Sequence, residues 1–216
     1  MASRYQHARA SASSRLKTQD AAQTFERDDV LVAVLADGGG GMRGGEAASR
    51  SLVAVVESAV GDRGFALERM QSWVDLFGAT DAALAASGPS QTTGVVVVVG
   101  PRGLMGLSTG DSEAWVVTST GVDNLTVGQH TRHRLGSSQM TAATFERSAL
   151  RGVLVVATDG LFKYAAEGVI ARIVRANAIG AAAEGLVELV RLRSGKVADD
   201  VAVVLVRQND AAPAPS

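Results

Sequence analysis

The sequence contains no cysteine, which excludes disulfide bonds and thiolate metal sites, so any metal ion must be held by oxygen or histidine ligands. Aromatic residues make up only 4% of the 216 residues, whereas hydrophobic residues make up 46%, so Val, Ala and Leu must fill the core. There is no basic excess, because 21 Lys and Arg stand against 22 Asp and Glu. This balance argues against a nucleic-acid or polyanion partner.

Long apolar runs are also missing. No stretch reaches the roughly 18 to 20 residues that a membrane-spanning helix needs. The first 14 residues, MASRYQHARASASS, lack the apolar segment of a secretion signal. We therefore expect a cytoplasmic protein without a membrane partner.

The apolar patterns predict strands in consecutive hairpins, interrupted twice by a pair of helices, and a polar, irregular segment at 119–150. This order indicates an α+β domain in which antiparallel sheets are covered by paired helices. Residues 208–216 are expected to form a disordered tail behind a domain at 1–207. Strands are predicted around 5–12, 22–25, 30–36, 92–99, 103–108, 114–118, 152–158 and 201–206, and helices around 46–58, 66–86, 167–176 and 181–192.

Acidic residues stand where apolar strands end or begin. Asp37 and Asp159 each follow such a strand and precede a glycine, Asp199 comes shortly before another strand, and Asp20 lies on the N-terminal connection. Mg²⁺ and Mn²⁺ prefer carboxylate, carbonyl and water oxygens, and the turn at Gly38 leaves its carbonyl available. Aspartate also caps turns at strand ends, so each residue alone has an ordinary structural explanation.

Six short motifs occur in an order that is typical of one family. Together, from about Arg15 to Val206, they resemble the metal-dependent PPM/PP2C protein phosphatases of the bacterial type. The motifs are Arg15 to Asp20 (RLKTQD), Ala36-Asp37-Gly38 with Gly44 to Ser49 (GGEAAS), Thr92-Thr93-Gly94, Gly110-Asp111-Ser112, Thr158 to Leu161 (TDGL) and Asp199-Asp200-Val201.

The resemblance implies a four-layer α-β-β-α sandwich, with two antiparallel sheets flanked by paired helices, over residues 1–207. It implies a site for two Mn²⁺ or Mg²⁺ ions, with Asp37 bridging both. Asp159 and Asp199 would hold one ion, the Gly38 carbonyl would bind the other, and Asp20 would hold the waters of that second ion.

The activity that the resemblance implies is hydrolysis of phosphoserine and phosphothreonine in proteins. Arg15 and Asp37 would be the catalytic residues, with the guanidinium of Arg15 binding the phosphoryl oxygens. A hydroxide that bridges two cations is a nucleophile at neutral pH, so no Ser, Cys or His nucleophile is needed. We expect a monomer that acts on phosphorylated proteins, with a Ser/Thr kinase as its counterpart.

The sequence departs from the family pattern at several positions. Met42 stands where bacterial members usually carry His, so the leaving group must be protonated by another donor or by water. Lys163 stands where many members have an Asp for a third ion, and its ammonium would compete with that cation. Asp111 is a candidate contact for a third ion, but a stable third site is not expected. The segment from Leu135 to Leu150 is short for the mobile flap beside this type of site, which suggests an open cleft.

Other hypotheses remain at this point. A catalytically weak relative could bind phosphoproteins or scaffold a partner, as Met42 and Lys163 suggest. Residues 39–44 satisfy G-x-G-x-x-G between a strand and a helix, but a second helix follows where a dinucleotide-binding unit needs a parallel strand. His130 and His133 could form a ligand pair, although no third ligand of that kind is nearby, and solvated loop histidines fit better.

Overall fold

The computed structural model describes residues 3–39, 44–129 and 132–209. The chain forms two five-stranded antiparallel sheets, and each contains strands from both halves of the sequence. In spatial order, sheet A consists of β1 (Tyr5–Ala12), β10 (Val201–Gln208), β9 (Val153–Ala157), β6 (Glu113–Val117) and β7 (Val122–Asn124), and sheet B consists of β2 (Asp20–Arg27), β3 (Val30–Asp37), β4 (Gly94–Gly100), β5 (Gly103–Thr109) and β8 (Ala143–Arg147).

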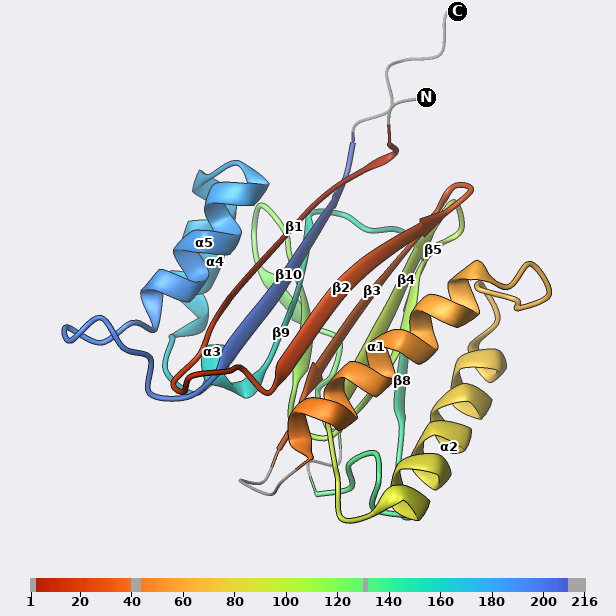
Figure 1. Ribbon diagram of the computed structural model, residues 1–216. Helices are drawn as coiled ribbons and strands as arrows, with labels where there is room; N and C mark the ends of the chain where they lie inside the picture. The colour runs from red at the N-terminus through yellow and green to blue at the C-terminus, as the bar shows by residue number, and fades with distance from the viewer. Residues whose placement is uncertain (1–2, 40–43, 130–131, 210–216) are drawn as a thin grey trace, which may run out of the picture.

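Helices cover the outer faces of both sheets (Figure 1). The pair α1 (Gly45–Gly61) and α2 (Met70–Ser87) packs on sheet B, and the pair α4 (Glu167–Ala176) and α5 (Ile179–Leu189) packs on sheet A. The short helix α3 (Asp159–Phe162) follows β9 directly. The predicted α+β sandwich of two antiparallel sheets with flanking helix pairs is confirmed.

The central strands are apolar along their whole length because both of their faces are buried. In β3, Leu31 and Leu35 point into the core between the sheets, while Val32 and Val34 pack under α1 and α2. Side chains alternate across a strand, so a strand with a sheet on one side and helices on the other needs no polar position. This explains why valine and leucine fill the core of a chain with few aromatic residues.

The structure differs from the sequence prediction mainly in the segment 119–150. This segment was expected to be irregular, but it contributes the short edge strands β7 and β8. Strand β2 is longer than predicted and begins at Asp20, and β10 continues to Gln208. Of the expected tail, residues 210–216 lie outside the described residues. No helix in the described part of the chain has the length and apolar character to cross a membrane.

The topology also bears on the nucleotide-binding alternative. Strand β4, which follows the two helices, pairs with β3 in the antiparallel direction. A dinucleotide-binding unit requires a parallel strand after its helix, so its βαβ arrangement does not occur here. Of the glycine-rich turn itself, residues 40–43 lie outside the described residues.

Candidate functional site

Three carboxylates from distant parts of the sequence meet where the two sheets come together. Asp37 ends β3, Asp111 lies in the turn from β5 to β6, and Asp159 opens α3. One carboxylate oxygen from each of them lies within 4.8 Å of the others. This spacing allows the three side chains to contact one cation. We refer to Asp37, Asp111 and Asp159 as the acidic cluster.

Asp20 stands next to Asp37 because the two residues are register partners at the ends of β2 and β3. Its side chain is only 7% exposed, and its Oδ2 accepts a hydrogen bond of 2.9 Å from Thr158 Oγ1. Its Oδ1 is buried and has no hydrogen-bond partner among the described residues. Such an atom is costly to bury unless something occupies the space beside it.

The charges of Asp20 and Asp37 indicate which kind of group stabilises this pair. Burial, followed by repulsion from Asp37, raises the pKa of Asp20 to about 9. Burial and repulsion from Asp159 raise the pKa of Asp37 to about 6, against the opposing effect of Arg134. A buried and a half-buried carboxylate side by side are stabilised by either a shared proton or a cation. Hard oxygen donors of this kind suit Mg²⁺ or Mn²⁺, so the residues present fit a divalent ion.

The backbone around Asp37 is fixed by hydrogen bonds from the start of β4. Thr93 N and Thr92 Oγ1 both donate to the Asp37 carbonyl, at 2.9 and 3.0 Å, and Asp37 N donates to Thr93 Oγ1 at 2.9 Å. Thr93 Oγ1 in turn lies 2.7 Å from Ser112 Oγ, beside Asp111. The paired threonines that the sequence singled out therefore position the strand end.

Gly38 lies in a tight space between two backbone segments. Its N–H donates to Gln19 O at 3.1 Å. A Cβ at this position would lie 2.2 Å from the carbonyl oxygen of Gly45, at the start of α1. Only glycine allows this approach, which packs the residue after Asp37 against the start of α1.

Two cationic side chains border the acidic cluster. Lys163, one turn after Asp159, places its ammonium on Asp159 Oδ2. This hydrogen bond, followed by the negative charges around it, raises the pKa of Lys163. Arg134 donates from Nη2 to both oxygens of Asp111, at 3.0 and 2.9 Å. Lys163 was expected here from the sequence, whereas Arg134 was missed because it lies in the segment that was predicted to be irregular.

Asp199 is not part of the three-carboxylate group. It is half-buried just before β10, where Oδ1 accepts the N–H of Asp200 at 2.9 Å, and its charge acts on Lys163. Asp200 binds the connection between β1 and β2. Its Oδ1 accepts hydrogen bonds from Ser13 and Ser14, and its Oδ2 accepts the N–H of Gln19 at 2.8 Å.

These hydrogen bonds fix the connection from β1 to β2. Burial alone would raise the pKa of Asp200, but the hydrogen bonds from Gln19 and Ser14 outweigh it and lower the pKa. Arg15, on this connection, is exposed, and its Nη1 donates to Gln19 Oε1 at 3.0 Å. Within the described residues no hydrogen bond or ion pair joins Arg15 to the acidic cluster.

Of the other sequence candidates, His133 places Nδ1 3.1 Å from Thr141 Oγ1 and does not belong to the cluster. His130 and Met42 lie outside the described residues.

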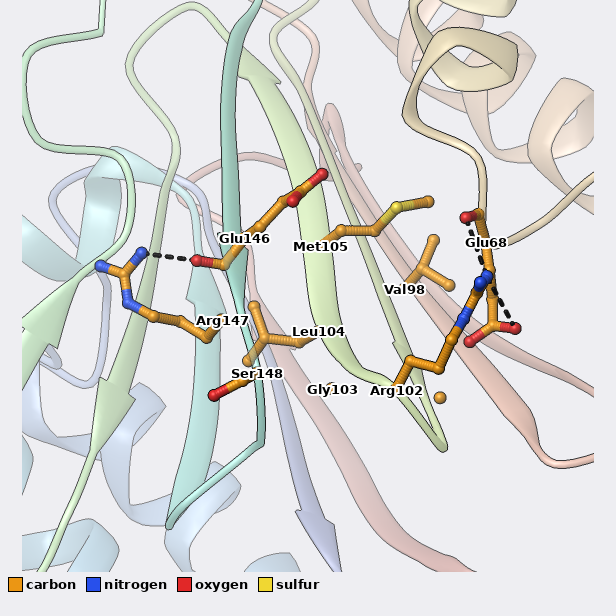
Figure 2. A pocket seen from close by; sticks show the side chains of 10 residues that line it. Glu68, Val98, Arg102, Gly103, Leu104, Met105, Glu146, Arg147 and Ser148 are labelled. Atoms are coloured by element: carbon orange, nitrogen blue, oxygen red, sulfur yellow. Dashed lines mark hydrogen bonds and ion pairs between the residues drawn. The ribbon is translucent and has the colours of Figure 1, made fainter.

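A hollow of about 410 Å³ opens directly beside the cluster. Its lining includes Asp111, Asp159, Lys163, Glu113 and Phe162. A second hollow, of about 430 Å³, lies at the opposite end of β4 and β5 and is shown in Figure 2. There, Arg102 contacts Glu68, and no residue of the acidic cluster takes part. Of these two hollows, the first is the one that residues of the acidic cluster line.

The sequence matches no family model and no curated protein. Solved structures match closely. The serine/threonine phosphatase of S. agalactiae superimposes with a TM-score of 0.81 at 20% identity, over 95% of this chain and 100% of that one. The Mycobacterium tuberculosis phosphatase PstP/Ppp gives a TM-score of 0.81 at 20% identity, over 95% of this chain and 99% of that one.

This chain has the fold of bacterial serine/threonine phosphatases. A further structure with this phosphatase fold, the catalytic domain of PstP in complex with two manganese ions, matches at 22% identity with a TM-score of 0.77, over 95% of this chain and 99% of that one.

Proposed function

We propose that the chain is a metal-dependent phosphatase that hydrolyses phosphoserine and phosphothreonine in proteins. The observation that carries this proposal is the pair formed by the buried Asp20 and the half-buried Asp37, set beside Asp111 and Asp159. This arrangement suits divalent cations, and it occurs on a fold that the chain shares with serine/threonine phosphatases.

The residues present would hold two ions, Mn²⁺ or Mg²⁺. Asp37 is central because it lies next to both Asp20 and Asp159. We assign Asp37 to both ions, Asp159 and Asp199 to one, and the Gly38 carbonyl with Asp20 to the other. When bound, such ions lower the pKa of water and neutralise charge on a phosphoryl group.

The remaining work falls to the protein side chains. Arg15 is exposed on the connection between β1 and β2, and Asp200 holds the backbone of this connection in place at Gln19. The guanidinium of Arg15 can therefore turn from Gln19 to the phosphoryl oxygens of a bound substrate. The hollow beside Asp111 and Asp159 gives the phosphorylated side chain access to the cluster. Asp20, shielded from solvent, offers its carboxyl oxygens to a cation at the end of the strand.

A catalytically weak protein that binds phosphoproteins or scaffolds a partner is the second candidate. It is favoured by the ion pairs of Lys163 with Asp159 and of Arg134 with Asp111, which already neutralise two carboxylates. Hydrolysis of p-nitrophenyl phosphate at increasing Mn²⁺ concentration separates the two functions. Turnover that rises with Mn²⁺ supports the enzyme, and no turnover at any Mn²⁺ concentration supports the scaffold.

The Asp37→Asn variant completes this experiment. We expect it to lower turnover by at least about 100-fold, because one side chain serves both ions. Asp29→Asn is the matched control, since Asp29 is exposed just before the opposite end of β3. Equal activity of the Asp37→Asn variant and the wild type would refute the proposed metal centre.

The substrates that we propose are phosphorylated proteins, with a Ser/Thr kinase as the opposing enzyme. We further propose that the chain acts as a cytoplasmic monomer without a nucleic-acid or membrane partner. The balanced charge of the sequence, 21 basic against 22 acidic residues, supports the absence of a polyanion partner. Sedimentation of the purified chain tests the monomeric state.

A further inference from the structure

Arg134 is rigidly attached to the strand that carries Asp37. The residue after it, Leu135, forms a two-way backbone bridge with Thr92, with hydrogen bonds of 2.9 and 3.0 Å. Thr92 Oγ1 also donates to the Asp37 carbonyl at 3.0 Å. On the other side, Gly136 N donates to Asp81 Oδ1 of α2 at 2.7 Å. The backbone of Arg134 therefore has a fixed position relative to the acidic cluster.

The guanidinium of Arg134 lies over the backbone that follows Asp37. A Cβ on Gly39 would lie 1.6 Å from Arg134 Nη1, so the guanidinium occupies the space that any other residue at position 39 would fill. The side chain is 22% exposed, and that of its partner Asp111 is 26% exposed. This position brings the planar group to the mouth of the cluster, and its charge opposes the rise in the pKa of Asp37.

Most donors of this guanidinium have no acceptor within residues 3–39, 44–129 and 132–209. Among the described residues, only Nη2 of Arg134 forms hydrogen bonds, both of them to Asp111. Nη1 and Nε keep their N–H groups for another acceptor. A planar guanidinium with two neighbouring donors matches the oxygens of a phosphate group.

The charges of the site favour this use over a further metal ion. The carboxylates of Asp20, Asp37, Asp111, Asp159 and Asp199, with the cations of Arg134 and Lys163, leave a formal charge of −3. Two divalent ions bring this to +1, which suits an anionic substrate. A further ion at Asp111 would have to enter against both Arg134 and Lys163.

We propose that Arg134 is a phosphate-binding residue of this site and that Asp111 positions Arg134 instead of holding a metal ion. This inference rests on the proposed function, because it assigns a substrate contact within that site. It adds to Arg15 a second arginine, one that is already oriented before substrate arrives. Asp111 is then a positioning residue, since it acts through the guanidinium.

Calorimetric titration of inorganic phosphate into the Mn²⁺-loaded full chain tests the role of Arg134. We expect Arg134→Gln to raise the Kd for phosphate at least 10-fold. Arg134→Lys should recover only part of the affinity, because an ammonium lacks the paired donors. Arg132→Gln is the matched control, an exposed arginine two residues away. Thermal unfolding of each variant establishes that it is folded.

The role of Asp111 is tested by comparing two affinities in Asp111→Asn. We expect the Kd for Mn²⁺ to stay within about threefold of the wild-type value, while the Kd for phosphate rises about as much as in Arg134→Gln. A large loss of Mn²⁺ affinity would make Asp111 a metal ligand and overturn the inference, as would unchanged phosphate affinity in Arg134→Gln. Failure of the proposed function looks different, because the wild type would then neither bind Mn²⁺ nor turn over substrate.

Discussion

Asp20 and Asp37 lie directly opposite each other on the neighbouring strands β2 and β3, with Asp20 Oδ1 buried and unpartnered among the described residues. Adjacent positions in a sheet normally carry side chains that attract one another or pack together. Here two carboxylates face each other, and their pKa values rise to about 9 and about 6. The repulsion is a cost to the fold that bound cations remove.

The first prediction concerns stability against pH without metal. Both carboxyls have a higher pKa in the folded chain than in the unfolded chain, so between about pH 4 and pH 9 the folded state binds more protons. The free energy of unfolding in EDTA should therefore fall as pH rises through this window, by at most about 1.4 kcal/mol per pH unit for each proton. Urea unfolding at pH 6 and pH 8.5 measures this, and saturating Mn²⁺ should abolish the fall.

The variant Asp20→Asn is the control for this effect. Its amide can still accept from Thr158 and can donate to Asp37, so no repulsion remains. We expect the metal-free variant to be more stable than the wild type at pH 8.5, by about 1–3 kcal/mol, and to bind Mn²⁺ more weakly. If the variant is less stable than the wild type at pH 8.5, repulsion between Asp20 and Asp37 is not the cause of the pH dependence.

Gly38→Ala tests the tight backbone approach beside Asp37. Its Cβ would meet the Gly45 carbonyl oxygen at 2.2 Å, and neither backbone segment can move without displacing the strand end or α1. We expect a loss of about 1–3 kcal/mol in stability and a loss of Mn²⁺ affinity, by urea unfolding and calorimetry. Gly61→Ala, at the end of α1 with no atom within 4 Å of its Cβ, should be neutral or slightly stabilising. Similar behaviour of the two variants would argue against this explanation.

Asp200→Ala tests the support of the connection that carries Arg15. The change removes the acceptor for Ser13, Ser14 and Gln19 at a position that is only 7% exposed. We expect a loss of about 1–3 kcal/mol in unfolding free energy, because the N–H groups of Ser14 and Gln19 lose a charged acceptor. The KM for a phosphopeptide should rise, because the backbone on either side of Arg15 is no longer held in place by Asp200. Asp75→Asn, an exposed side chain on α2, serves as the control.

Lys163→Gln tests the competition between a side-chain cation and a metal ion. The ammonium of Lys163 contacts Asp159, so its removal should lower the Kd for Mn²⁺ by about 3- to 10-fold at low ionic strength. Lys196→Gln, at an exposed position after α5, is the matched control. Equal Mn²⁺ affinities of the two variants would show that the ammonium moves away at no cost.

The parts of the site that the sequence predicted are those with a local signal. Asp37 and Asp159 follow apolar strands that are buried on both faces, so their positions at strand ends could be derived from the pattern alone. Arg134 had no such signal. Its position depends on the bridge between Leu135 and Thr92, a contact between segments about 40 residues apart that no local periodicity encodes.

Thr158 Oγ1 donates to Asp20 on sheet B and accepts the N–H of Ala202 from β10 of sheet A. One hydroxyl thus joins residues 20, 158 and 202, which are separated by most of the polypeptide. A nascent chain that still lacks β10 has no Ala202, so the half of this link that reaches sheet A cannot form. The proposed phosphatase activity would therefore depend on β10, because this strand completes the hydrogen bonds that join the two sheets beside Asp20.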